Sequence, residues 1–204
     1  MAYCDWFAEN DLQRSYHEEW GTPVHDDQRQ FEFLSLEVMQ CGLSFGLILQ
    51  RREILNQCFD SFDPEKVSAY GEADVQRILE TTGMIRSEAK VRAIISNAKA
   101  FLQVQQEYGS FDAYLWRFSG YRSIVYHGHE TGLVPASNGL SQCISKDLKQ
   151  RGFRFLGPVV MYSFLQACGI INDHAADCPR RKELMERYPT IEKRRYQEKC
   201  VHQY

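Results

Sequence analysis

Apolar residues recur every three or four positions along most of this chain, whereas runs that alternate between apolar and polar residues are scarce. The first pattern is typical of helices that bury one face, and the second is typical of strands. In the segment 81–104 such a face consists of Val91, Ile94, Ile95, Ala98 and Leu102. The pattern predicts an all-α fold.

Helix boundaries in the first half of the chain follow from residues that cap helices. Asp63, with Pro64 at the first helical position, predicts one start, and the segment 71–74 predicts a second. A short hairpin at 83–86 then leads into a helix capped by Ser87.

The second half of the chain predicts two further helices. One is expected over 140–151 and is stopped by Gly152, and the other opens at Pro158 and is apolar enough to lie in the core. Residues 121–137 contain several helix breakers and are predicted to form a surface loop.

The apolar stretch 31–45 contains a carboxylate that needs an explanation. If the stretch is one helix, Glu37 lies at the edge of a face that should be buried. A carboxylate in apolar surroundings is costly unless a partner compensates its charge. We therefore expect Glu37 to serve a partner that is positively charged or donates hydrogen bonds.

The composition is that of a globular protein. The 204 residues suffice for one domain with an ordinary core, and 44% of them are apolar and 25% charged. No apolar run approaches the length of a bilayer span, and the first residues lack the pattern of a secretion signal. We expect a cytoplasmic protein without a membrane segment.

The net charge of −3 is unevenly distributed. Residues 180–204 carry eight Lys or Arg and four Asp or Glu, a net of +4, which leaves −7 for residues 1–179. We expect residues 1–179 to form the main domain and residues 180–204 a charged tail or peripheral helix. An acidic domain argues against unspecific coating of nucleic acid but leaves a local basic footprint open. Seven basic residues are candidates for this footprint, and each could equally lie on a solvated helix face: Arg86, Lys90, Arg92, Lys146, Lys149, Arg151 and Arg154.

The seven cysteines, an odd number without a secretion signal, predict reduced thiols rather than a disulfide framework. Two of them have a histidine at a spacing that suits a metal: His174 with Cys178, and His17 with Cys4. Two thiolates and two imidazoles would complete a tetrahedral zinc site without room for water, so the zinc would be structural. On spacing alone, a core histidine and inert cysteines remain the alternative.

Five aromatic residues lie within the first twenty positions: Tyr3, Trp6, Phe7, Tyr16 and Trp20. The polar residues between them do not predict a packed helix with these rings on one stripe. The segment is therefore expected either to line a pocket or to form a small N-terminal core lobe.

Four blocks occur in the order CDWFAENDLQRSYHEEWGTP, LSLEVMQCGLSF, TTGMIRSEAKVRAIISNAKAF and KDLKQRGFRFLGPVVMYSFLQACGIINDHAADC. Together they resemble the DNA-3-methyladenine glycosylase I family, the Tag enzymes, from Cys4 to Cys178. The resemblance implies an all-helical member of the helix-hairpin-helix glycosylases that acts on double-stranded DNA containing alkylated bases. We expect it to work as a monomer.

The resemblance also implies roles for individual residues outside the pocket. The zinc ligands would be Cys4, His17, His174 and Cys178, so that the metal ties the N-terminal segment to the end of the core helix. The hairpin would hold the DNA backbone, because free amides at a helix N-terminus suit a phosphate. Its residues would be Gly83, Ile85, Ser87 and Lys90.

For Glu37 the resemblance implies a place facing the extruded base. 3-Methyladenine in DNA is a cation, which a buried carboxylate would pair with, whereas neutral adenine would leave the carboxylate uncompensated. Aromatic faces, which attract cations, would enclose the base, and Ser163 would add a polar group. The rings would be those of Tyr16, Trp20, Phe45 and Trp6. The expected function is a monofunctional glycosylase of base-excision repair that hydrolyses the N-glycosidic bond with water.

Three positions depart from the family pattern. Phe45 stands where tryptophan is usual, Val38 where glycine is common, and Gln13 where tyrosine is frequent. Phenylalanine attracts cations less than tryptophan, and valine adds bulk next to Glu37. Two alternatives therefore stay open: a glycosylase with a shifted lesion preference, and a catalytically silent, zinc-stabilised DNA-binding protein.

Overall fold

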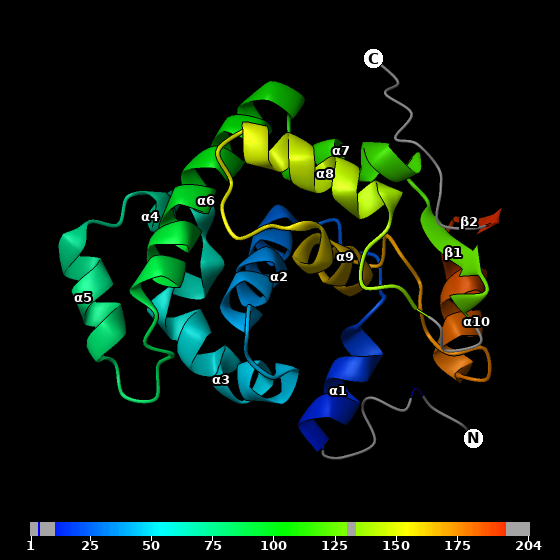
Figure 1. Ribbon diagram of the computed structural model, residues 1–204, viewed down its shortest axis with the longest axis horizontal. Helices are drawn as coiled ribbons and strands as arrows, with labels where there is room; N and C mark the ends of the chain where they lie inside the picture. Colours follow the sequence, from blue (N-terminus) through cyan, green and yellow to red (C-terminus); the bar gives the residue numbers. More distant parts are fainter. Residues whose placement is uncertain (1–3, 5–10, 130–133, 195–204) are drawn as a thin grey trace.

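The computed structural model describes residue 4 and residues 11–129 and 134–194. Helix α2 (Asp27–Gln40) lies at the centre, and all its residues from Gln30 to Met39 are buried. The helices packed around it are α3 (Phe45–Cys58), α6 (Glu88–Tyr108), α7 (Phe111–Trp116) and α9 (Pro158–Ala167) (Figure 1). A helix buried along this length needs no wide polar face, which explains why six of the nine residues from Phe31 to Met39 are apolar.

Shorter elements cover this core. Helix α1 (Asp11–Glu19) contacts α3, while α4 (Pro64–Ser68) and α5 (Glu72–Glu80) pack on α6, and α8 (Gly139–Gln150) lies on α9. The remaining helical elements are α10 (Pro179–Arg187) and the short 3-10 turns η2 (Asp60–Phe62) and η3 (Arg117–Ser119).

The predicted helix starts are confirmed. The Asp63 side chain accepts hydrogen bonds from the amides of Glu65 and Lys66 at the start of α4. Helix α5 follows Gly71, and α6 follows Ser87, although the Ser87 side chain makes no capping hydrogen bond. Helices α8 and α9 also occupy the predicted segments.

Two expectations about helices were wrong. The stretch 31–45 is not one helix, because α2 ends at Gln40, the chain turns at Gly42 with a φ of +75°, and α3 begins at Phe45. The polar N-terminal segment does form a helix, α1, whose polar residues face solvent while Tyr16 and His17 are buried.

A small parallel sheet corrects the expectation of a surface loop at 121–137. Strand β1 (Ser123–His127) pairs with β2 (Thr190–Arg194), so the charged tail contributes a strand as well as α10. On its other side, the Ile124 amide donates to the Ile170 carbonyl (2.8 Å), and the Ile124 carbonyl accepts from the Asn172 amide (2.9 Å). Strand β1 is thus buried between two segments and fixes the one that leads to His174.

The cysteines follow the expectation only in part. Five of them are free thiols, but Cys143 is disulfide-bonded, so the prediction of reduced thiols is wrong there. The free ones are Cys4, Cys41, Cys58, Cys168 and Cys178. Within the described ranges, no helix combines the length and apolarity needed to cross a bilayer.

Candidate active site and metal cluster

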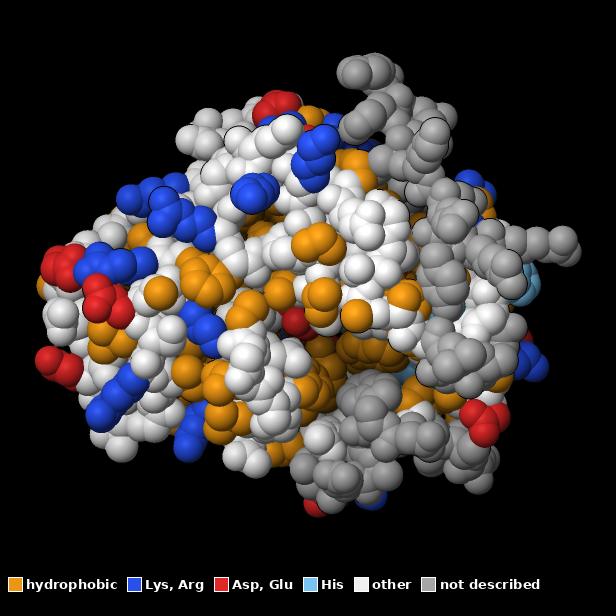
Figure 2. All heavy atoms as spheres, viewed as in Figure 1, with side chains coloured by type: hydrophobic (Ala, Val, Ile, Leu, Met, Phe, Trp, Pro, Cys, Tyr) orange, Lys and Arg blue, Asp and Glu red, His pale blue; other side chains and the backbone are white. Residues whose placement is uncertain are grey.

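A pocket of about 500 Å³ lies among α1, α2, the start of α3 and α9, a size that suits a small molecule. Figure 2 shows hydrophobic side chains gathered around a hollow in this face, with an acidic side chain within it. The described lining residues are Gln13, Tyr16, Trp20, Glu37, Gln40, Ser44, Phe45, Gly46, Val134, Ser163, Gln166 and Asp173.

The pocket brings together most of the residues expected to bind a base. Tyr16 of α1 and Phe45 of α3 form a tilted ring pair with centroids 4.7 Å apart, and Trp20 follows α1. Ser163 lines the pocket from α9. Trp6 lies outside the described residues.

Glu37 is the carboxylate to which the pocket gives no partner. Its residue is only 9% exposed, and burial raises the pKa of its carboxyl from 4.5 to about 8. Among the described residues, no side chain or backbone amide forms a hydrogen bond or ion pair with this carboxyl. Its carboxyl group is therefore available to a ligand in the pocket.

Asp173 shows the opposite arrangement, and sequence reasoning missed it as a pocket residue. Its Oδ2 accepts hydrogen bonds from the Tyr162 hydroxyl (2.6 Å) and the Gln166 amide (2.8 Å), and its Oδ1 accepts one from His129. A carboxylate satisfied on both oxygens fixes the protein around the pocket rather than waiting for a ligand. The signal in the sequence was an acidic residue directly before His174 in an apolar segment.

A network of charges positions α1 next to the pocket. Arg52 donates to Glu19 (2.7 and 2.8 Å) and to Glu32 (2.8 Å), and Arg29 bonds both carboxylates as well. The Arg52 guanidinium also lies 5.8 Å from the centre of the Tyr16 ring. Since Glu19 ends α1, the network anchors the helix that carries Tyr16 onto α2 and α3.

The departures from the family pattern divide into two groups. Phe45 and Gln13 line the pocket, as expected. Val38 is completely buried in the hydrophobic core and does not line the pocket, so the bulk that it adds next to Glu37 faces the core. Neighbouring positions on a helix point about 100° apart, which turns Val38 away from the face of Glu37.

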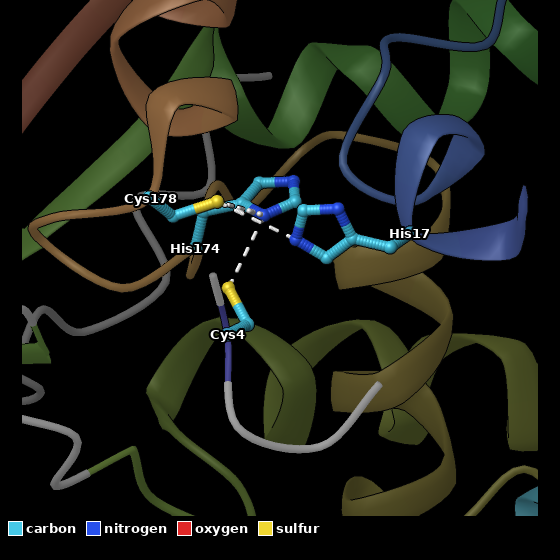
Figure 3. A group of neighbouring side chains, drawn as sticks. All are labelled: Cys4, His17, His174 and Cys178. Atoms are coloured by element: carbon cyan, nitrogen blue, oxygen red, sulfur yellow. Dashed lines mark hydrogen bonds between the residues drawn. The ribbon is translucent and has the colours of Figure 1, made fainter. Parts of the chain in front are cut away.

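The predicted metal ligands converge at one point, as Figure 3 shows. Cys4, His17, His174 and Cys178 are all buried, and their ligand atoms lie within 4.8 Å of one another. Three sulfur–nitrogen distances are 3.5, 3.4 and 3.8 Å. Zinc bonds of about 2.3 Å to sulfur and 2.0 Å to nitrogen would separate these atoms by about 3.5 Å in a tetrahedron, so the cluster fits a tetrahedral ion.

The protonation of the cluster also suits a metal. The Nε2 atom of His174 lies 3.0 Å from the Trp20 carbonyl, which only accepts, so Nε2 carries the proton and Nδ1 presents a lone pair to the sulfurs. Burial lowers the pKa of His174 to about 4 and also lowers that of His17, which keeps both rings neutral. Burial raises the pKa of the Cys4 thiol to about 12, so a thiolate there needs a cation beside it.

Three of the residues expected to hold the DNA backbone lie between α5 and α6, and the fourth, Lys90, lies in the first turn of α6. Gly83 has a φ of +82°, and a Cβ there would lie 2.9 Å from Ile54, so the turn requires glycine. Ile85 and Ser87 are half-buried on the same turn. The ammonium of Lys90, however, is buried and donates to the carbonyls of Met39 (2.9 Å) and Cys41 (2.6 Å) at the end of α2.

The basic candidates differ in how they are engaged. Arg92 pairs with Glu72 and Glu88, and Arg151 pairs with Glu107 and Asp147. The other candidates are exposed, and none of their side chains has an ion pair or hydrogen bond with a described residue: Arg86, Lys146, Lys149 and Arg154.

Comparisons with known proteins agree with this arrangement. The family model for methyladenine glycosylase matches residues 6–182. The chain is 41% identical to DNA-3-methyladenine glycosylase 1 of Escherichia coli K12 over 179 residues, which cover 87% of this chain and 96% of that protein. It is 37% identical to DNA-3-methyladenine glycosylase of Haemophilus influenzae, covering 86% and 96% of the two chains.

Solved structures show the same relationship. A structure of 3-methyladenine DNA glycosylase I from Staphylococcus aureus, which concerns recognition of 3-methyladenine, superimposes with a TM-score of 0.83 at 33% identity. The match covers 87% of this chain and 95% of that one. With its family model, its relatives and its fold in agreement, the chain belongs to the methyladenine glycosylase family.

Proposed function

We propose that this protein is a DNA-3-methyladenine glycosylase of base-excision repair. It takes an alkylated adenine out of double-stranded DNA and hydrolyses its N-glycosidic bond with water. The relatives at 41% and 37% identity carry this name, and the S. aureus structure concerns 3-methyladenine itself. We further propose that it works as a cytoplasmic monomer, with residues 1–179 as the catalytic domain and 180–204 as a peripheral segment.

The observation that carries the proposal is the free carboxyl of Glu37 in an aromatic pocket. A cationic base that enters the pocket provides the positive partner that the Glu37 carboxylate does not have within the protein. The ion pair forms in a low-dielectric site, where it is strong. The rings of Tyr16, Trp20 and Phe45 offer faces that attract a cation more than a neutral base. Unmodified adenine gains neither interaction, so recognition supplies most of the selectivity.

Chemistry in the pocket needs little acid catalysis. When the bond between base and sugar breaks, its electron pair leaves with the methylated base, which departs neutral, and the positive charge moves to the deoxyribose. Water then adds to the sugar carbon and loses a proton. Glu37 is the anion near this charge, and Ser163 offers a hydroxyl at the pocket wall. We assign no lysine nucleophile and therefore expect no strand cleavage.

Zinc is the metal that we propose for the cluster. Cys4, His17, His174 and Cys178 supply two sulfurs and two imidazoles, which is a common zinc set, and four protein ligands leave no site for a catalytic water. When bound, the ion supplies structural stability. The four residues orient the N-terminal segment against the end of the core.

DNA binding through a helix-hairpin-helix element is the third part of the proposal. Helices α5 and α6 flank a glycine turn, and the amides at the start of α6 suit a phosphate. Gly83, Ile85 and Ser87 would form this contact. Lys90, whose ammonium holds the end of α2, would support it from within rather than touch the phosphate.

The decisive test is the release of free 3-methyladenine from methylated duplex DNA by the purified protein, followed by chromatography. We expect release by the wild type and strong loss of release in Glu37→Gln. Duplex binding without release would support the silent DNA-binding alternative. Release of a different alkylated base would support the alternative of shifted specificity, with Phe45 and Gln13 as the residues to test.

A further inference from the structure

A glycine at the start of α3 leaves open space in the wall of the base pocket. Gly46 is the second residue of this helix and lines the pocket. A Cβ at this position would lie 3.7 Å from Nε2 of Gln13, an ordinary contact, and would meet no other described atom outside its own stretch of helix within 4 Å. Alanine would fit here and stabilise the helix more. Packing therefore does not explain the glycine, whereas a ligand that closely approaches the backbone would.

Two N–H donors border this space. The Gly46 amide lies in the first turn of α3, where helical amides have no acceptor within the helix, and among the described residues it has no hydrogen-bond partner. The second donor is the Nε2 amide group of Gln13, which lies beside the same space. Because position 46 has no Cβ, a ligand can reach the backbone amide directly. Two donors beside one small space suit an oxygen atom, which accepts hydrogen bonds.

Glu37 determines how an alkylated adenine lies relative to this space. Its buried carboxyl accepts hydrogen bonds and has no partner among the described residues, and the donor that adenine offers is the amino group on C6. N3 lies at the opposite end of the purine, beside the bond to the sugar. With the amino group at Glu37 on α2, a substituent on N3 therefore points away from α2. Gln13 and Gly46 lie on the other walls, formed by α1 and α3.

The pocket is also larger than a methylated purine requires. Its volume of about 500 Å³ falls in the range of pockets that enclose drug-sized ligands, roughly 300–1,000 Å³. A purine with one methyl group is smaller than such a ligand. Phe45, which precedes Gly46 and stands where the family usually has tryptophan, adds to this room with its smaller ring. The pocket can therefore hold a substituent longer than methyl.

We propose that Gln13 and Gly46 form an oxygen subsite for the N3 substituent, so that this enzyme accepts adenine with a 2-hydroxyalkyl group on N3 besides 3-methyladenine. Such a base forms in DNA when an epoxide alkylates N3. The hydroxyl oxygen accepts from the Gly46 amide and the Gln13 side chain, while the cationic ring pairs with Glu37. The same N-glycosidic bond breaks: its electron pair leaves with the base, and water adds to the sugar and loses a proton. This inference rests on the proposed function, because it extends the substrates of the same pocket.

The test compares three bases with the full chain: 3-methyladenine, 3-(2-hydroxyethyl)adenine and 3-propyladenine. Propyl matches hydroxyethyl in size but has no oxygen, so it separates the hydrogen bonds from the space. Single-turnover release from duplex DNA and the affinity for each free base are measured. We expect the wild type to bind the hydroxyethyl base about tenfold more tightly than the propyl base, the gain that one net hydrogen bond implies. It should release the hydroxyethyl base at a rate comparable with that of 3-methyladenine.

Substitutions separate the two parts of the subsite. Gln13→Leu keeps most of the volume but removes the side-chain donor, so the hydroxyethyl base should lose most of its advantage over the propyl base. Gly46→Val fills the space, so the ratio of hydroxyethyl to methyl release should fall about tenfold. Gly46→Ala should lower this ratio by less and should melt at or above the wild-type temperature, which excludes unfolding as the cause. Gly71→Ala is the control, because Gly71 also has open space at its Cβ position but lies outside the base pocket, and both ratios should stay unchanged.

Three results would overturn the subsite: equal affinities of the wild type for the hydroxyethyl and propyl bases, a release ratio that Gly46→Val leaves unchanged, or release of 3-methyladenine without release of the hydroxyethyl base. In the last case the proposed function stands and only the subsite falls. If the wild type releases no base at all, the proposed function fails, and the affinities for the free bases still judge the subsite because binding needs no cleavage.

Discussion

The Nε2 atom of His174 donates a hydrogen bond to the carbonyl oxygen of Trp20 over 3.0 Å, so a residue of the Cys/His cluster holds a wall of the pocket. The two rings also meet edge to face with centroids 4.7 Å apart. Gly21, the next residue in the chain after Trp20, has a φ of +77°, and a Cβ there would lie 3.0 Å from Nε2 of His174. The cluster and the pocket therefore depend on each other.

Removing one cluster ligand should affect both metal content and base binding. We expect one zinc per wild-type chain and less in Cys178→Ser, with a melting temperature about 10 °C lower, as a loss of roughly 3–4 kcal/mol implies at this size. Affinity for free 3-methyladenine should fall as well, because Trp20 loses its support. Elemental analysis, calorimetry and a binding titration check this. The control is Cys41→Ser, a half-buried thiol outside the cluster. Folded, stable wild-type protein without metal would contradict the zinc proposal.

Activity should depend on the ionisation of Glu37. Its pKa of about 8 means that the carboxyl is mostly protonated at pH 6, and only the carboxylate pairs with a cationic base. We expect kcat/KM for methylated duplex to rise about tenfold per pH unit from pH 6 and to level off near pH 8. The residual activity of Glu37→Gln should be low and flat over this range. A flat wild-type profile would argue against an essential carboxylate.

The same group should make the protein less stable as pH rises. The carboxyl has a pKa of 4.5 when unfolded and about 8 when folded, so the folded state binds the extra proton between these values. The stabilisation that this proton provides is complete below pH 4.5 and is lost by pH 8. It amounts to at most about 5 kcal/mol, since each unit of pKa difference contributes roughly 1.4 kcal/mol. Glu37→Gln cannot lose a proton. Its melting temperature should match that of the wild type at pH 5 and exceed it at pH 8.5, as thermal scans would show.

Lys90 and Arg86 should affect different properties. Lys90→Met leaves the carbonyls of Met39 and Cys41 without their donor and should destabilise the fold by about 2–3 kcal/mol.

Arg86→Ala should leave stability unchanged, weaken duplex binding similarly for any sequence and reduce the slope of binding against salt concentration by about one charge. Arg92→Ala is the control, since Glu72 and Glu88 already engage that guanidinium. Denaturant titrations and binding over a salt series separate the three. Equal salt slopes for Arg86→Ala and the wild type would place the DNA footprint elsewhere.

A larger aromatic face at position 45 should strengthen recognition of the cation. The Phe45 ring lies against Tyr16 and lines the pocket, and tryptophan offers a cation the best of the aromatic faces. Phe45→Trp should therefore raise kcat/KM for 3-methyladenine in duplex DNA a few-fold, which corresponds to part of a cation–π energy of about 0.5–2 kcal/mol. If the structure of Phe45→Trp shows an otherwise unchanged pocket and kcat/KM is unchanged or lower, the smaller ring of Phe45 does not limit the activity of this enzyme.

The sequence was most informative where structure depends on near neighbours. Asp63 and Pro64 start α4 through bonds to the next few amides, so their positions suffice to predict the helix. For the pocket and the Cys/His cluster, the residues alone left two alternatives each, and family resemblance was needed to choose between them, since Cys4 and His174 meet across nearly the whole chain.

Features set by distant neighbours escaped prediction. Strand β1 forms because the backbone of Ile124 hydrogen-bonds Ile170 and Asn172 on one side, while the strand pairs with β2 on the other. These partners are distant in the chain, and the sequence of β1 does not alternate between apolar and polar residues, so nothing local predicts a strand. The charge of Lys90 was visible, but the carbonyls that face it were not. Nor does a phenylalanine signal a positive φ: Phe155, in the loop between α8 and α9, has a φ of +60°, and Asn97 of α6 holds the backbone of its neighbour Arg154.

The link between Cys4 and Cys178 has a consequence for synthesis of the protein. A ribosome makes the chain from its N-terminus, so Tyr16, Trp20 and Glu37 emerge long before His174 and Cys178 can close the cluster around Cys4. Strand β2, which covers β1, emerges later still. A nascent chain thus has its recognition residues but no enclosed site until synthesis has passed Cys178.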